Sequence, residues 1–233
     1  MALLSGGQSD FFGLDIGTIG LRVVQLHGTG QPKSLAHYGE AAFDPTVASG
    51  GSIIDKHRFS QILAQLVKKA GISTKNVAVN IPSQRVFTTI VDIPKMDPAE
   101  LEKTIRYQAD SFIPMPVAKS KIDWQLIGDS PTGSDKLEVL LSGVANDFVE
   151  ARLELVEAGG FNVIAMEADN MALARSVVAP ESLGPQLILD IGSITSDLVI
   201  VKDSVPHLVR SIPIGSQNIV HSASPSSSHG LCV

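Results

Sequence analysis

Short apolar runs, separated by glycine turns and by a helical pattern, account for the first part of the chain. Phe11–Ile16 and Leu21–Leu26 are β-leaning runs joined by a short turn with glycine at both ends, a pattern that predicts a β-hairpin. A third strand is expected within Ser34–Phe43. Asp55 precedes a stretch in which the apolar positions recur on one helical face, which predicts an amphipathic helix that Gly71 ends. We therefore expect a small sheet covered by a helix.

The pattern changes over residues 83–144. A strand is predicted at Val86–Val91, and the segment Asp97–Glu100 is typical of a helix start, with a capping aspartate followed by proline. This helix is expected to end before Pro114. The order strand–helix–strand–strand predicts a small α+β unit inserted into the first domain. Its last two strands are predicted over Ile122–Leu126 and Leu137–Val144.

The last third of the chain alternates between helices and strands and then loses its pattern. Asn146 is expected to cap a helix, and Pro180–Pro185 has the composition of a linker. Residues 220–233 carry no charge and no hydrophobic period, so we expect an unstructured tail there. The other elements predicted here are a helix over Met171–Val178 and strands over Val163–Met166, Gln186–Asp190, Asp197–Lys202 and Leu208–Ile214.

Composition narrows the class of protein. The chain has 233 residues, is 44% hydrophobic and 18% charged, and carries a net charge of −6, which is typical of a folded protein and a poor match to a nucleic-acid binder. Cys232 is the single cysteine, so an internal disulfide framework and a cysteine zinc site are excluded. No apolar run reaches the roughly 18–20 residues of a membrane helix, and Met1–Asp10 lacks the features of a secretion signal. We expect a cytoplasmic protein without direct membrane insertion.

A five-residue motif occurs twice in the chain. Asp15-Ile16-Gly17-Thr18-Ile19 returns as Asp190-Ile191-Gly192-Ser193-Ile194, 175 residues later, and each copy joins two apolar strands. An Asp-x-Gly turn between strands is common as plain hairpin chemistry, so a single copy would favour a structural role. Two copies in the same strand–turn–strand context favour a shared function.

The residue types of this motif suit a nucleotide phosphate. Glycine lets a turn present its backbone N–H groups at close range, and a threonine or serine hydroxyl can donate to phosphate oxygens. A carboxylate can hold Mg²⁺ through the water molecules that this ion retains, a role we expect for Asp15 and Asp190. The two turns are therefore predicted to clamp phosphates from both sides of a cleft, with no catalytic residue assigned. The candidate nucleotide-binding residues given by the motif are Asp15, Gly17, Thr18, Asp190, Gly192 and Ser193, and the second copy adds Asp197.

The paired turns resemble the two phosphate motifs of the actin-like ATPase superfamily, and other segments resemble one family within it, the PilM family of type IV pilus assembly proteins. The similarity extends over residues 11–215, and Gly13–Thr18 carries the resemblance to the superfamily. The more specific resemblance to the PilM family is carried by Leu101–Ala109, Phe112–Pro116, Asp123–Gln125 and Arg210–Gly215.

For the fold, the resemblance implies an α/β protein of the actin-like, ribonuclease H-like class. It implies a subdomain IA formed by residues 11–82 and 145–180, split by an inserted α+β subdomain, 1C, over residues 83–144. An incomplete subdomain IIA is expected over residues 186–219, followed by the tail at 220–233. The chain is thus expected to be a C-terminally truncated member of the family.

For function, the resemblance implies a cytoplasmic scaffold that binds ATP and Mg²⁺ in the cleft, with at most a weak ATPase activity. Its implied partners are a short cytoplasmic peptide of the inner-membrane protein PilN, bound in the region of IA and 1C, and other pilus-platform proteins, so that membrane association is peripheral. Without the family's adenosine pocket, ATP binding is expected to be weak. The implied phosphate-1 residues are Asp15, Gly17 and Thr18, and the implied phosphate-2 residues are Asp190, Gly192, Ser193, Thr195 and Asp197.

Two alternatives stay open within the superfamily. A small-molecule kinase would need a general base near the γ-phosphate, and the sequence offers no convincing candidate beyond the Mg²⁺-linked carboxylates. An FtsA-like division protein would need a C-terminal amphipathic helix, which residues 222–233 do not provide. The segment Ile113–Pro116 favours the PilM family over both.

Overall fold

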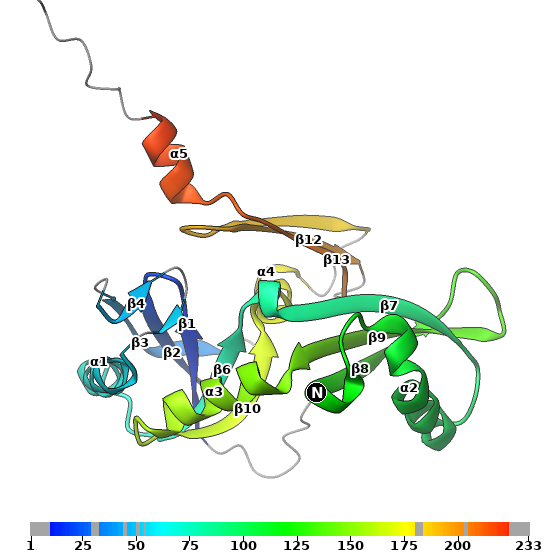
Figure 1. The fold of residues 1–233 in the computed structure, drawn as a ribbon, viewed down its shortest axis with the longest axis horizontal. Helices are drawn as coiled ribbons and strands as arrows, with labels where there is room; N and C mark the ends of the chain where they lie inside the picture. Colours follow the sequence, from blue (N-terminus) through cyan, green and yellow to red (C-terminus); the bar gives the residue numbers. More distant parts are fainter. Residues whose placement is uncertain are drawn as a thin grey trace, which may run out of the picture.

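The architecture consists of separate sheets joined and covered by helices (Figure 1). This computed structural model describes residues 10–28, 33–43, 46–49, 52–53, 55–179, 184–202 and 205–223. The first part contains β1 (Phe12–Ile16), β2 (Gly20–His27), β3 (Ser34–Ala42), β4 (Ala48–Ser49), β5 (Ser52–Ile53), α1 (Lys56–Lys69) and β6 (Asn76–Ile81). The middle contains η1 (Ser83–Arg85), β7 (Val86–Pro94), α2 (Pro98–Phe112), η2 (Val117–Lys119), β8 (Ser120–Asp129) and β9 (Lys136–Ala145). The last part contains α3 (Asn146–Glu157), β10 (Asn162–Ala168), α4 (Asp169–Val177), β11 (Gln186–Ile191), β12 (Ser196–Lys202), β13 (Val205–Ile212) and α5 (Ser216–Ala223).

The first sheet has five strands in the order β10-β6-β1-β2-β3, and it packs against α1 and α3. β1 pairs in parallel with β6 and antiparallel with β2, so the hairpin predicted for the first two strands is confirmed. Asp55 caps α1 by accepting a hydrogen bond from the Arg58 amide at 2.9 Å, and Gly71 follows the helix with a φ of 76°. Both predicted ends of this helix are confirmed. The buried residues between sheet and helices include Phe12, Leu14, Val23, Phe59, Leu63 and Val156.

The inserted residues form a unit with its own sheet, in the order β7-β9-β8, and its own core. The predicted start of α2 is confirmed, because Asp97 accepts hydrogen bonds from the amides of Ala99 and Glu100, both at 3.0 Å. In Figure 1 this green unit lies at the opposite end of the molecule from β2 and β3. Its buried residues include Ile93, Leu101, Ile105, Ala109, Val139 and Leu141.

The last strands form a third sheet, β11-β12-β13, which lies above α4 in Figure 1. One face of this sheet packs on α4, where Ala174, Val199 and Val201 are buried. Because α4 also contacts β10, this helix connects the third sheet to the first. None of the described helices combines the length and the apolarity that crossing a membrane requires. The other face of the sheet exposes the β11 side chains of Leu187, Leu189 and Ile191.

Two boundaries differ from those predicted from the sequence. Asn146 is predicted as a cap, but it is the first residue of α3, and Ala145 occupies the capping position without a side-chain hydrogen bond. The reason is that β9 runs directly into α3, so the last residue of the strand, with φ −63° and ψ 135°, takes the place of the cap. The tail is predicted to begin at residue 220, but α5 continues to Ala223. Parts of the expected linker and tail lie outside the described residues, namely 180–183 and 224–233.

Candidate functional site

The two copies of the repeated motif form matching turns that contact each other. Each turn is closed by a hydrogen bond from the amide of its glycine to the carbonyl three residues later, at 3.0 Å for Gly17 and 2.9 Å for Gly192. The hydroxyls of Thr18 and Ser193 form a hydrogen bond between the turns. Residues that are 175 positions apart in the sequence are thereby brought together. The eight candidate residues all lie in these turns or in the strands that flank them.

The second turn is held in place by the start of α5. A Cβ atom on Gly192 would lie 2.9 Å from a carbonyl oxygen of the same turn, and one on Gly215 would lie 2.4 Å from the Ser193 carbonyl oxygen. Both positions therefore need glycine for space. The Ser216 amide donates to the Gly192 carbonyl at 2.8 Å. The position of Ser193 is thus set by a close backbone contact as well as by its own turn.

The first turn is anchored by polar groups from β6 and α3. The Asn80 side chain accepts a hydrogen bond from the Ile16 amide at 2.8 Å, and the Arg152 guanidinium donates to the Ile16 carbonyl at 3.4 Å. Burial lowers the pKa of Arg152 to about 10, and the nearby carboxylates of Asp15 and Asp169 oppose this shift. A buried cation is therefore fixed at the end of β1, directly before the turn.

Carboxylates cluster beside the second turn. Asp190 and Asp197 lie opposite each other in the β11–β12 pair. Burial raises the pKa of Asp197, the Ser211 hydroxyl opposes the shift by donating to it, and Asp190 adds to it. Burial also raises the pKa of Asp169, at the start of α4, although the Ser83 hydroxyl donates to this carboxylate. Negative charge is thus costly at this place unless a cation accompanies it.

The two residues predicted to hold Mg²⁺ lie on different turns. Asp15 precedes the first turn and forms an ion pair with Arg22 at 3.0 Å, which engages one of its two oxygens. Asp190 precedes the second turn and is exposed. The described residues hold no group of three or more His, Cys, Asp or Glu side chains that could bind a metal directly. Carboxylates and hydroxyls nevertheless suit Mg²⁺, since this ion retains much of its water shell.

Three residues of the site are missed by the sequence analysis. Gln84 donates to the Thr195 hydroxyl at 3.0 Å and to the Asp197 carboxylate at 3.3 Å. Arg152 and Asp169 are the other two. Gln84 and Arg152 reach the site through contacts between residues far apart in the sequence, which no local pattern marks. The sequence did offer a sign of Asp169, because it is an aspartate that lies between a predicted strand and a predicted helix, where site residues are often found.

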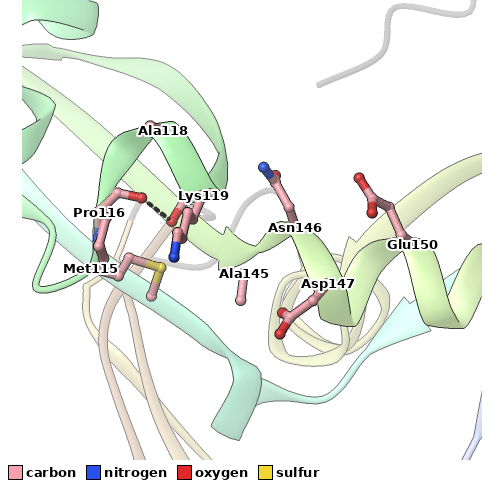
Figure 2. A pocket seen from close by; sticks show the side chains of 9 residues that line it. Met115, Pro116, Ala118, Lys119, Ala145, Asn146, Asp147 and Glu150 are labelled. Carbon is pink, nitrogen blue, oxygen red and sulfur yellow. Dashed lines mark hydrogen bonds between the residues drawn. The ribbon is translucent and has the colours of Figure 1, made fainter.

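A pocket of about 580 Å³ lies between η2, the end of β9 and the first turn of α3. Figure 2 shows the side chains of η2 and its flanking loop facing those of α3 across it. The Oδ1 atom of Asn146 is buried and has no hydrogen-bond partner within the described ranges. The η2 side of the pocket carries apolar side chains together with Lys119, and the α3 side carries Asn146 and two carboxylates. Its lining includes Met115, Pro116, Ala118 and Ala145 among the apolar residues and Lys119, Asn146, Asp147 and Glu150 among the polar residues.

Comparisons with known proteins place the chain among pilus-assembly proteins. The model of the type IV pilus assembly protein PilM family matches residues 13–223. A solved PilM–PilN type IV pilus biogenesis complex is 20% identical, with a TM-score of 0.77, over 92% of this chain and 64% of that chain. The cytoplasmic domain of EpsL, an inner membrane component of the type II secretion system of Vibrio cholerae, is 15% identical, with a TM-score of 0.56, over 95% of this chain and 78% of that chain. These likenesses confirm the expected actin-like α/β fold class, and this chain spans 64% of the length of the matched PilM chain.

We expect the two partly buried carboxylates to make stability depend on pH. The pKa values of Asp169 and Asp197 are raised above their ordinary value of 3.8, so the folded state binds these protons more tightly than the unfolded chain. Their stabilising contribution is fully present below 3.8 and is lost as the pH rises through the raised folded-state pKa. In urea unfolding, a variant with Asp169→Asn and Asp197→Asn should gain stability relative to the unsubstituted chain as the pH rises from about 4 to about 7.

An exposed carboxylate on the far end of α3 provides the control. Glu157→Gln, at the exposed end of the helix, removes one negative charge away from the glycine turns and controls for that loss of charge. A double variant whose profile stays parallel to that of the unsubstituted chain would show that the two aspartates titrate alike in the folded and unfolded states.

Proposed function

Because the chain belongs to the type IV pilus assembly protein PilM family, we propose that it is an actin-like scaffold of type IV pilus assembly. In this proposal ATP with Mg²⁺ binds between the two glycine turns, and a short cytoplasmic peptide of PilN binds in the pocket beside α3. The protein works in the cytoplasm and is held at the inner membrane through PilN and other pilus-platform proteins. The family match supports this role over those of a division protein and a small-molecule kinase.

The observation that carries the nucleotide part is the hydrogen bond between the Thr18 and Ser193 hydroxyls. Through this bond two hydroxyl groups, one from each glycine turn, lie next to each other and can both donate to one phosphate group. A phosphate group accepts hydrogen bonds from hydroxyls and from turn amides. A phosphate bound here would replace the hydroxyl–hydroxyl bond with charge-assisted bonds to its own oxygens, which are stronger than neutral ones.

The charge around the turns favours binding of the nucleotide together with a cation. Asp15, Asp190 and Asp197 border the turns, and like charges would repel an unaccompanied polyphosphate. Mg²⁺, held through water by Asp15 and Asp190, would neutralise charge on the phosphate oxygens. The residues on both turns offer contacts to phosphate alone, so we expect an affinity weaker than micromolar. The role assigned to this site is binding, with no catalytic residue.

The peptide part rests on the pocket beside α3 and on the likeness to a PilM chain solved with PilN. The volume of about 580 Å³ is in the range of ligand pockets and fits a few side chains of an extended segment. Apolar side chains of such a segment can pack on Met115 and Ala145 (Figure 2). The unpartnered Oδ1 of Asn146 can accept a hydrogen bond from a peptide N–H after a small side-chain rotation.

Removal of one hydroxyl from the turns should weaken nucleotide binding. Thr18→Val keeps the volume of the side chain but removes a donor to the phosphate. We expect Mg²⁺-ATP to bind about tenfold more weakly, because a hydrogen bond to a charged group contributes about 1.5 kcal/mol or more. Titration followed by ¹⁵N–¹H NMR measures this difference even when binding is weak. EDTA should abolish binding to the unsubstituted chain.

The matched control is Thr104→Val on α2, whose hydroxyl contacts Met96 in the inserted unit. It should leave nucleotide binding unchanged. Equal affinity in Thr18→Val and Thr104→Val would contradict the proposed site, and ATP binding that is unaffected by EDTA would contradict the role of Mg²⁺.

Filling the pocket should remove peptide binding. Ala118 is exposed on η2 and lines the pocket, so Ala118→Trp should occupy it without disturbing the core. We expect the affinity for a fluorescein-labelled peptide, with the cytoplasmic N-terminal sequence of a PilN protein from the same organism, to fall about tenfold or more. Fluorescence anisotropy measures the affinity. Ala99→Trp, at an exposed position on α2 outside the pocket, should bind normally; absence of binding to the unsubstituted chain would rule the proposal out.

A further inference from the structure

Residues 83–85, which form η1, lead from the first sheet into the inserted unit and contact the candidate nucleotide site. The Ser83 hydroxyl donates to the Asp169 carboxylate. The Gln84 side-chain amide donates to the Thr195 hydroxyl at 3.0 Å and to the Asp197 carboxylate at 3.3 Å. The connection that enters the inserted unit is therefore bonded to the second glycine turn and to the strand that follows it.

The connection that leaves the inserted unit is α3, and it contacts the first glycine turn. Its Arg152 donates to the Ile16 carbonyl at 3.4 Å. The ring of Phe148, also on α3, lies 5.4 Å from the guanidinium carbon of Arg152 and 5.4 Å from that of Arg85 in η1. Phe148 directly follows Asp147, which lines the pocket. The helical turn that borders the pocket is thus packed against η1.

We propose that Gln84 is a positioning residue that couples the two glycine turns to the pocket. The inference rests on the proposed function, because Mg²⁺-ATP and the PilN peptide are the two ligands concerned. While the Thr18 and Ser193 hydroxyls are in contact, no phosphate fits between them. Entry of a phosphate separates the turns and moves Thr195 relative to the first sheet. Gln84 follows Thr195, and η1 then changes its packing against α3.

The chemistry of Gln84 suits this role. Its side chain is exposed, so it can follow a moving turn without disturbing the core. One NH₂ group supplies both hydrogen bonds, to a hydroxyl and to a carboxylate. Gln84→Ala therefore removes the coupling contact, whereas Gln84→Glu keeps the length of the side chain but sets a carboxylate against Asp197. The two variants should act in the same direction, with Gln84→Glu the stronger.

Hydrogen exchange on the full chain without ligand tests the coupling. The amides of residues 150–153 bond to carbonyls in the first turn of α3. In Gln84→Ala we expect the amides of residues 150–153 and 192–195 to exchange about threefold to tenfold faster, because the loss of one hydrogen bond destabilises both segments by a similar factor. Gln108→Ala, at an exposed position on α2, should change neither segment. Unchanged exchange at 150–153 in both Gln84 variants would overturn the inference.

A second measurement separates this inference from the proposed function. In the unsubstituted chain we expect the affinity for the PilN peptide with Mg²⁺-ATP to differ about fivefold or more from the affinity without it. In Gln84→Ala the ratio of these two affinities should move towards one. If both ligands bind and Mg²⁺-ATP changes the peptide affinity of Gln84→Ala as much as that of the unsubstituted chain, the coupling role is wrong. It is also wrong if Mg²⁺-ATP leaves the peptide affinity of the unsubstituted chain unchanged. If neither ligand binds, the proposed function fails, and exchange at 150–153 alone decides whether Gln84 links the turn to α3.

Discussion

The hydrogen bond between the Thr18 and Ser193 hydroxyls is the contact on which the proposed nucleotide site depends, because it joins a hairpin of the first sheet to a hairpin of the third. Two features of the fold allow it. Helix α4 packs on β12 and β13 while contacting β10, which sets the position of the third sheet relative to the first. The start of α5 then holds the second turn through the bond from Ser216 to Gly192. The geometry of the turns thus follows from packing some distance away.

Elements whose ends are decided by one side chain could be predicted from the sequence. Asp97 accepts helix amides as expected, because a capping aspartate acts on residues two or three positions away, and Asp55 accepts a helix amide in the same way. The prediction that Asn146 caps a helix was wrong because a residue far along the chain decides where the helix begins. β9 stays paired with β8 up to Ala145, so the last residue of the strand occupies the capping position. Helix boundaries set by a neighbouring strand are beyond a local pattern.

The site itself was predictable only in part. The repeated motif marked both turns, since each copy keeps the aspartate, the glycine and a hydroxyl residue. The resemblance to the PilM family, carried in part by Phe112–Pro116, is confirmed by the family match over residues 13–223. Gln84 and Arg152 could not be predicted, because a glutamine in a connector and an arginine on a helix gain their hydrogen-bond partners from residues 72 or more positions away. The pocket could not be predicted from the sequence either, since η2 and α3 come together only in the folded chain.

A cysteine cross-link between the two turns tests the facing arrangement most directly. With Cys232→Ser as background, Thr18→Cys and Ser193→Cys leave two thiols at the positions of the touching hydroxyls. If the turns face each other, mild oxidation forms an intramolecular disulfide, detected by mass spectrometry of the non-reduced monomer. The pair Thr18→Cys and Ser60→Cys, with the second thiol on α1, should stay reduced. Free thiols at positions 18 and 193 in a folded monomer after oxidation would contradict the cleft and the nucleotide site built on it.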